Sequence, residues 1–319
     1  MVSGPDDDLA DLDNPVPGRR RIRRWRRIAV WTVAVLALLL VGGTAGLGWY
    51  VSVLNLEPHH ARSAPSDVAL GVGGTGEAPT VVLTESRATL RPGVHALSWS
   101  GGAAMVGDVV ARSPGRVERP LLRGAAPPTG TAVGVAWNYP EDPRSLLDLT
   151  IREISVPTEL GPAPAWYIPG SGPAASTWVI SVHGQNGTLA STMDGIPTMH
   201  RLGLSVLTIS YRNDVAAPRS PDGLIHLGES EWRDVDAAIR TARGMGAQRI
   251  VLDGSSMGGS IVGQTLVHSP QAHLVDAVVL DAPGLDYELT GRAALSRVGA
   301  PEFLVAPIGL IMQWRLGFA

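Results

Sequence analysis

The stretch Arg249-Ile-Val-Leu-Asp-Gly-Ser-Ser-Met-Gly-Gly-Ser260 decides the fold that we predict for this chain. Its apolar run Ile250–Leu252 is typical of a short strand buried on both faces. We expect the next segment, Ser260–Val267, to be a helix. The residues between them, Gly254–Gly258, have the form G-x-S-x-G, which marks a nucleophile elbow when it joins a strand to a helix. In a chain with 38 glycines the pentapeptide alone is a weak sign, so the prediction depends on this strand–turn–helix context.

The same turn predicts which groups would take part in a reaction: a serine hydroxyl and main-chain N–H donors that stabilise an oxyanion. A tight, strained turn projects the hydroxyl of Ser256, and it aims the N–H of Met257 at an oxygen bound in front of it. A second N–H donor is expected from the glycine-rich loop His183–Gly187, which follows an earlier apolar run. We predict Gln185 as this oxyanion donor and Asn186 as the next candidate. The alternative interpretation of the loop is an ordinary glycine-rich turn.

Apolar runs and one amphipathic helix alternate around the motif. A helix is predicted over Glu229–Met245, because apolar residues recur there at helical spacing opposite a charged face. Strands that alternate with helices predict a mostly parallel sheet with right-handed crossovers. The predicted strands are Trp178–Val182, Leu204–Ile209, Arg249–Leu252 and Val275–Leu280.

Roughly from Leu149 to Leu285, the chain resembles the α/β hydrolases, and in particular the membrane-anchored type found in actinobacteria. The resemblance implies the α/β-hydrolase fold, a twisted and mostly parallel sheet with flanking helices, and hydrolysis of an ester or amide through an acyl-enzyme on Ser256. The segments that carry it are Trp178-Val-Ile-Ser-Val-His-Gly, Ser210-Tyr-Arg-Asn-Asp, Gly228-Glu-Ser-Glu-Trp-Arg-Asp-Val, Gly254-Ser-Ser-Met-Gly-Gly and Val279-Leu-Asp-Ala-Pro.

The family also needs an acid and a histidine after the nucleophile. Only His268 and His273 follow it, and neither is predicted at the end of a late strand. Asp281 and Asp286 are candidate acids, although Asp281 also suits a turn. The earlier His183 is expected to be a structural hydrogen-bonding residue. We therefore expect the catalytic acid and histidine beyond residue 319, and interpret the chain as incomplete at its C-terminus: a fragment, a frameshifted product or a truncated gene model.

The N-terminal part predicts a membrane anchor. No charged residue occurs in Ile28–Leu56, which is longer than the ~20 residues that cross a bilayer. Seven arginines in Arg19–Arg27 precede it and place the N-terminus in the cytoplasm. We predict a single-pass protein of the cell membrane with its catalytic domain outside the cytoplasm. The alternatives are a cleaved signal peptide and a buried core helix.

These patterns divide the chain into five parts. They are a basic, disordered cytoplasmic tail (1–27), a transmembrane helix (28–54), a linker (55–79), a β-rich segment (80–157) and the α/β-hydrolase domain (158–319). We interpret the β-rich segment as leading strands of the hydrolase sheet, with a separate binding module as the alternative. Its predicted strands are Thr80–Thr84, Ala104–Val110, Ala132–Ala136 and Leu149–Val156.

Composition narrows the function further. The net charge of −3 gives no reason to expect a nucleic-acid partner, and the lack of cysteine excludes a thiol nucleophile and thiolate metal sites. Adjacent histidines, His59 and His60, are interpreted as solvated side chains of the linker, and no metal or cofactor is predicted. The predicted function is a serine hydrolase of the esterase or lipase kind, acting on a small-molecule ester or amide. The alternatives are a serine peptidase, an acyltransferase and a non-catalytic anchored relative.

Overall fold

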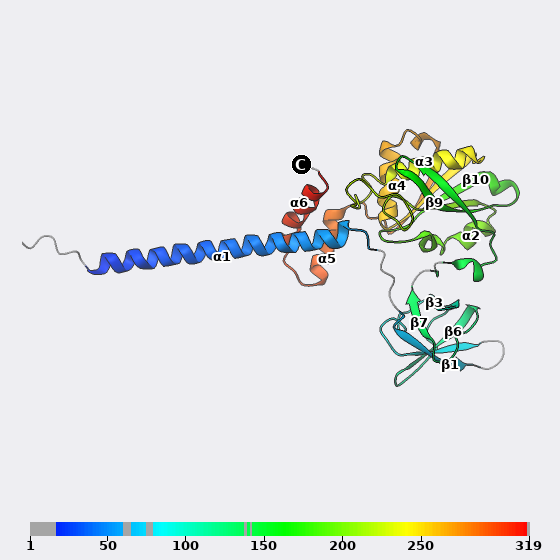
Figure 1. Ribbon diagram of the computed structural model, residues 1–319, viewed down its shortest axis with the longest axis horizontal. Helices are drawn as coiled ribbons and strands as arrows, with labels where there is room; N and C mark the ends of the chain where they lie inside the picture. Colours follow the sequence, from blue (N-terminus) through cyan, green and yellow to red (C-terminus); the bar gives the residue numbers. More distant parts are fainter. Residues whose placement is uncertain (1–16, 60–64, 75–78, 137–138, 141, 318–319) are drawn as a thin grey trace, which may run out of the picture. The chain divides into compact units, whose positions relative to one another are not determined.

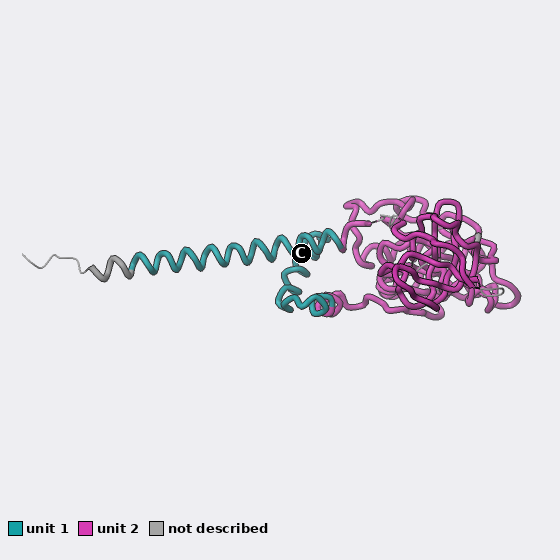
Figure 2. The backbone as a smooth tube through the Cα atoms, turned by 90° about the horizontal axis from the view of Figure 1, so that it is seen from below, with its two compact units in different colours: residues 1–54, 294–319 teal, residues 55–293 magenta. Residues whose placement is uncertain are grey.

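The computed structural model describes residues 17–59, 65–74, 79–136, 139–140 and 142–317. The chain forms two compact units, one of residues 1–54 with 294–319 and one of residues 55–293 (Figure 2). Residues 1–16 of the predicted cytoplasmic tail (1–27) lie outside the described residues.

One long helix, α1 (Pro17–Leu56), makes up most of the first unit (Figure 1). Its part Arg23–Leu56 is long and apolar enough to cross a membrane, by length and composition. The interpretation of residues 17–27 as part of a disordered tail was wrong, because α1 already begins at Pro17. Proline suits a first helical position, and arginine is a good helix former.

The second unit contains a six-stranded sheet in the order β13-β12-β10-β11-β9-β8. The four strands from β13 to β11 run parallel, whereas β9 and β8 join antiparallel at the other end. The strands are β8 (Arg152–Thr158), β9 (Gly161–Ile168), β10 (Thr177–Val182), β11 (Ser205–Ile209), β12 (Arg249–Ser255) and β13 (Val275–Asp281). The predicted mostly parallel sheet is therefore present. The bounds of β10, β11 and β13 differ from the predicted ones by one residue, and β12 extends three residues further, to Ser255.

Alternate side chains of the parallel strands enter two different cores. One core lies between Ile180 of β10 and the helices α3 (Trp232–Gly244) and α4 (Met257–His268). The other lies between Val179, on the opposite face, and the short helix α2 (Ile196–Arg201). Coverage on both faces explains why β10 and β11, which are buried at every residue, are mostly apolar in the sequence.

The residues before this sheet form a separate barrel and are not its leading strands. Six strands close into a ring through the pairing of β2 with β6, and β5 is added at the edge of β6. The members are β1 (Asp67–Gly73), β2 (Thr80–Thr84), β3 (His95–Trp99), β4 (Gly102–Val106), β5 (Ala111–Ser113), β6 (Arg116–Gly124) and β7 (Ala132–Ala136). The barrel has its own core around Leu83, Leu97 and Val106.

The structure moves two of the predicted segment boundaries, the end of the linker (55–79) and the end of the β-rich segment (80–157). The linker predicted for 55–79 contains a strand, β1, which pairs with both β2 and β7. The sequence pattern of this strand suggested a linker, because glycines cluster in its C-terminal half and directly after it. At the other boundary, β8 belongs to the six-stranded sheet although it falls within the segment 80–157, because it pairs along its whole length with β9.

Candidate active site

Ser256 occupies the turn between β12 and α4, as predicted. Its backbone has φ 54° and ψ −121°, a conformation that is strained for a residue with a side chain. Main-chain bonds hold the turn: the Ser256 N–H donates to the Asp281 carbonyl (2.9 Å), and its own carbonyl accepts from Gly284 N–H (3.0 Å). The Ser256 side chain is exposed at the N-terminus of α4, where the helix dipole favours negative charge.

Three glycines allow the strand and the helix to approach at this turn. A β-carbon on Gly254 would lie 2.6 Å from the carbonyl oxygen of Gly258. One on Gly258 would overlap the carbonyl oxygen of Val182, at the end of β10, and one on Gly259 would lie 2.5 Å from the Pro283 side chain. The strand and the helix therefore pack closely around the turn, since none of the three positions has room for a side chain.

The loop after β10 lies against Ser256. A β-carbon on Gly184 would be 3.0 Å from the Ser256 β-carbon and 3.5 Å from its Oγ. The Gly184 carbonyl points the other way, since it accepts from Tyr211 Oη (2.9 Å) and from His183 Nδ1 (2.8 Å). In a trans peptide the N–H points opposite to the carbonyl, so the Gln185 N–H is directed away from Tyr211.

His183 is buried and bonded at both ring nitrogens. Its Nε2 lies 2.9 Å from Asp214 Oδ2, and its Nδ1 faces the Gly184 carbonyl. Both partners accept, so the ring carries a proton on each nitrogen. Burial on its own lowers the pKa of His183, but the charge of Asp214 and the two hydrogen bonds outweigh it, and the pKa is raised above its ordinary value. An imidazolium without a free lone pair is a structural group and cannot serve as a base.

Tyr211 and Asp214 are positioning residues that the sequence did not identify. The Tyr211 ring stacks on His183 with the ring centres 4.5 Å apart, and its N–H donates to Asp214 Oδ2 (2.8 Å). Burial, followed by the charge of Asp214, raises the pKa of the Tyr211 phenol well above its ordinary value, so it remains a hydrogen-bond donor. The available signal was the run of polar residues directly after β11.

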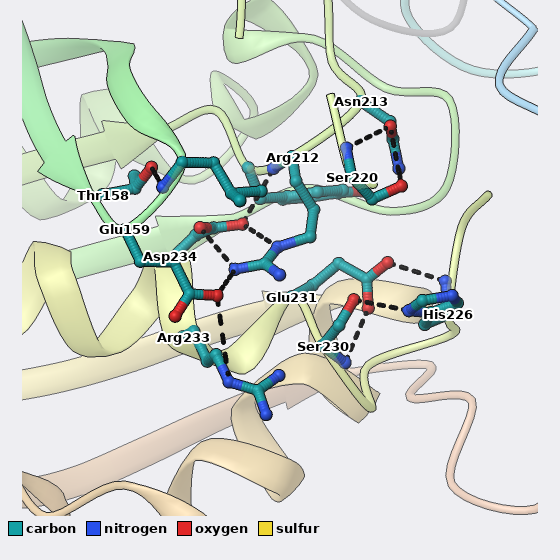
Figure 3. A network of polar contacts seen from close by, with 12 residues as sticks. Thr158, Glu159, Arg212, Asn213, Ser220, His226, Ser230, Glu231, Arg233 and Asp234 are labelled. Carbon is teal, nitrogen blue, oxygen red and sulfur yellow. Dashed lines mark hydrogen bonds and ion pairs between the residues drawn. The ribbon is translucent and has the colours of Figure 1, made fainter. Parts of the chain in front are cut away.

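A second buried network fixes the approach from β11 to α3 (Figure 3). The Arg212 guanidinium donates to both carboxylate oxygens of Asp234, at 2.9 and 3.0 Å, and also to Glu159 at 2.9 Å. Such a two-pronged pair holds a fixed geometry. Because Arg212 follows Tyr211 directly, this ion pair also anchors the tyrosine that supports the loop beside Ser256.

Asp222, His226 and Ser230 are bonded in the order of a catalytic triad (Figure 3 shows the last two). Distances are 2.8 Å from Asp222 Oδ2 to His226 Nε2 and 2.8 Å from His226 Nδ1 to Ser230 Oγ. However, Ser230 is only 8% exposed, and the adjacent carboxylate of Glu231 accepts from three main-chain N–H groups of this turn. We interpret the group as a support for the turn before α3.

The predicted base candidates lie far from Ser256. His273 precedes β13, which runs parallel to β12, so it lies at the opposite end of the sheet, roughly 20 Å away. His268 ends α4, about 18 Å along the helix from Ser256, and packs near the Trp232 ring. Within the described residues, no histidine is hydrogen-bonded to Ser256, and no group of three or more His, Asp or Glu side chains could hold a metal ion.

The two candidate acids differ in position. Asp281 ends β13 beside the elbow. Burial raises the pKa of the nearby Asp253, and the charge of Asp281 adds to this increase. Asp286 caps a helix, since its Oδ1 accepts from the N–H of Leu289 (2.8 Å) in the first turn of α5 (Tyr287–Arg297). Only Asp281 therefore lies where it could act on a site at Ser256.

Residues 55–59, at the end of the apolar stretch and directly after it, are bonded to the loop beside Ser256. The Gln185 side chain donates to the Asn55 carbonyl, and Asn186 Oδ1 accepts from the His59 N–H (2.9 Å). Between these contacts Leu56 is fully buried, and its carbonyl accepts from Ile225 N–H (2.7 Å). His59 thus contributes its main chain to this contact. His60, the other histidine of the predicted linker pair, lies outside the described residues.

A comparison with protein-family models matches the barrel. A family model described as "Domain of unknown function (DUF8805)" matches residues 69–138, which correspond to the barrel. No curated protein sequence matches the chain.

Several solved structures are similar to part of the chain. An esterase of Pyrococcus furiosus, Pf2001, is 20% identical with a TM-score of 0.42 over 54% of this chain and 64% of that chain. A Pyrobaculum calidifontis esterase is 19% identical with a TM-score of 0.36, over 50% and 55%. The Xanthomonas campestris protein XC6422, described as an α/β serine hydrolase without lid, is 18% identical with a TM-score of 0.35, over 42% and 61%. The chain spans less than two thirds of the length of these three proteins.

Proposed function

We propose that this protein is a serine hydrolase that cleaves a small-molecule ester or amide through an acyl-enzyme on Ser256. The observation that carries the proposal is the strained, exposed conformation of Ser256 at the start of α4, with Gly184 packed beside its side chain. Strain at one residue persists only where the surroundings impose it, and here four glycines make it possible.

In the proposed reaction a base takes the hydroxyl proton of Ser256 as its Oγ attacks the substrate carbonyl, and negative charge develops on the carbonyl oxygen. The tetrahedral adduct then expels the alcohol or amine with that proton, and water hydrolyses the acyl-enzyme to release the acid and restore Ser256. The N–H of Met257 and the N–H of Gln185 stabilise the negative carbonyl oxygen, and the α4 dipole adds to them. One such donor typically contributes about 10²–10³ in rate. The hydrogen bonds of Tyr211 and His183 to the Gly184 carbonyl keep the Gln185 N–H turned towards the site.

The proposal also concerns location. We propose that α1 anchors the protein in the cell membrane, with Arg19–Arg27 on the cytoplasmic side and the unit of residues 55–293 outside. A cleaved signal sequence passes the same tests of length and composition. Intact mass of the protein isolated from membranes distinguishes them, because cleavage would remove the residues of α1.

Hydrolysis of p-nitrophenyl butyrate tests the function. The assay includes imidazole as an external base, because no described histidine contacts Ser256. We expect Ser255→Ala to retain turnover, and Ser256→Ala to fall to the rate of imidazole alone. Equal rates for wild type and Ser256→Ala, in protein with unchanged circular dichroism, would refute the proposed nucleophile.

A further inference from the structure

The helix α6 (Val305–Arg315) packs on the last turns of α1 within the unit of residues 1–54 and 294–319 (Figures 1 and 2). A β-carbon on Gly48 would overlap the Ile311 side chain and lie 3.5 Å from the Ile308 α-carbon. Gly48 and Ser52 are four residues apart and share one face of α1. Small residues at this spacing let two helices approach closely.

Polar and aromatic contacts fix the C-terminal end of α6. The rings of Trp49 and Trp314 lie 6.4 Å apart between their centres, and the Arg315 guanidinium lies 4.6 Å from the centre of the Trp49 ring. Arg315 also donates to Ser52 Oγ (3.0 Å). A guanidinium over an indole ring is a favourable cation–π contact. These contacts keep α6 at one level along α1.

Large apolar side chains of α6 and of the turn before it are exposed, beside those that contact α1. Ile308 is 8% exposed, whereas Leu310 is 65% and Trp314 is 68% exposed. Phe303, in the preceding turn (Glu302–Leu304), is 63% exposed. Gln313 and Arg315 are the only polar side chains between Val305 and Arg315. A contiguous apolar surface of this kind marks a binding face for a protein or a membrane.

The level at which α6 binds is the outer boundary of a bilayer. A hydrocarbon core takes about 20 helical residues, and counting from Ile28, the first residue after the arginines, this length reaches Leu47. Gly48–Ser52 therefore falls at the polar interface, where tryptophan and tyrosine concentrate. Trp49 and Tyr50, 49% and 60% exposed, lie at this level.

We infer that α6 is an interfacial membrane helix whose partner is the lipid of the outer leaflet. Phe303, Leu310 and Trp314 enter the boundary between headgroups and acyl chains, and Arg315 reaches the phosphates while its stem stays on the Trp49 ring. The inference rests on the proposed anchor but not on the proposed catalysis. Its basis is the exposure of Leu310 and Trp314 together with the contact between Trp314 and Trp49, which places α6 beside the outer end of the proposed span.

Single-cysteine labelling tests this directly, because the natural chain contains no cysteine. Full-length L310C is labelled with an environment-sensitive fluorophore and reconstituted in vesicles of phosphatidylcholine and phosphatidylglycerol. Quenching is measured with nitroxide lipids that carry the label near the headgroup or deep in the acyl chain. V267C, on α4 and 74% exposed, is the control outside the membrane, and L38C, on α1 and 75% exposed, reports the anchor.

We expect shallow nitroxide to quench L310C several-fold more than V267C, and deep nitroxide to quench L38C most. If L38C is quenched and L310C behaves like V267C, the interfacial helix is wrong while the anchor stands. If L310C instead forms disulfide-linked dimers at low protein density, a second copy covers this face and the inference is also overturned. An unquenched L38C overturns the anchor, and the inference with it, and leaves the catalytic proposal to its own test.

Discussion

Two neighbouring strands of the same sheet, β12 and β13, differ in how completely the fold surrounds them. Both have seven residues, run parallel and end at the candidate site, in Ser255 and Asp281. On β12, Ile250 and Leu252 are fully buried, whereas on β13 Val279 is 50% exposed. Ser256 thus follows the better covered strand, and the side of the site where an acid would stand lies on the more exposed one. The two strands still meet at the turn, because the Ser256 N–H donates to the Asp281 carbonyl.

The largest expected effect is on the buried side. Asp214→Ala leaves the charged His183 ring without its partner, and losing one partner of a buried pair typically costs about 3–5 kcal/mol. The matched change at the more exposed His226 pair, Asp222→Ala, should cost about 1 kcal/mol or less. Urea unfolding of both variants measures the difference, and equal costs would contradict the assigned ion pair.

The raised pKa of His183 adds a pH signature to that measurement. The charged ring stabilises the fold fully below its unfolded-state pKa of about 6.5, and this stabilisation is lost as the pH rises through the raised folded-state value. Wild-type stability should therefore fall above about pH 6.5. Asp214→Ala should show a weaker fall, and a wild type whose stability rises over this range would show that the ring is neutral.

Matched truncations sharpen the comparison between the strands themselves. Leu252→Ala should cost about 2–5 kcal/mol, because it leaves a cavity in a closed core. Leu280→Ala, at a residue 39% exposed on β13, should cost less than about 1 kcal/mol. If thermal unfolding gives the two variants the same loss, β13 is covered in solution and the contrast between the strands fails.

Two glycines of α4 test the elbow. Gly258→Ala forces a β-carbon into the Val182 carbonyl, and overpacking of this kind costs about 1–3 kcal/mol. At Gly263 the nearest atom to a new β-carbon is 3.6 Å away, so Gly263→Ala should stabilise the helix by about 0.5–1 kcal/mol. Opposite signs in calorimetry are expected, and two stabilised variants would show that the turn is looser than the structure has it.

The smallest effect concerns the support of the oxyanion loop. Tyr211→Phe removes one hydrogen bond to the Gly184 carbonyl, worth about 1 kcal/mol of stability. Because the bond orients the Gln185 N–H, we expect acylation of Ser256 to slow by about tenfold, equal to 1.4 kcal/mol of barrier. An unchanged acylation rate would mean that the loop holds its orientation without the phenol.

The elbow could be predicted because its signals are local. The apolar run, the serine and the glycines stand within Arg249–Ser260, and the structure places them as a strand, a turn and a helix. Tyr211 could not be assigned, since its hydroxyl bonds a carbonyl 27 residues earlier in the chain. The barrel was missed for a similar reason, because its closure depends on the pairing of β2 with the distant strand β6.

Labelling with a fluorophosphonate probe tests the central claim most directly. The full chain is treated with the probe in imidazole buffer, beside Ser256→Ala and Ser255→Ala, and the modified peptide is mapped by mass spectrometry. We predict a single adduct on Ser256 in the wild type and in Ser255→Ala, and none in Ser256→Ala. A folded wild type that stays unlabelled, or an adduct that persists in Ser256→Ala, would contradict the assignment of Ser256 as the nucleophile.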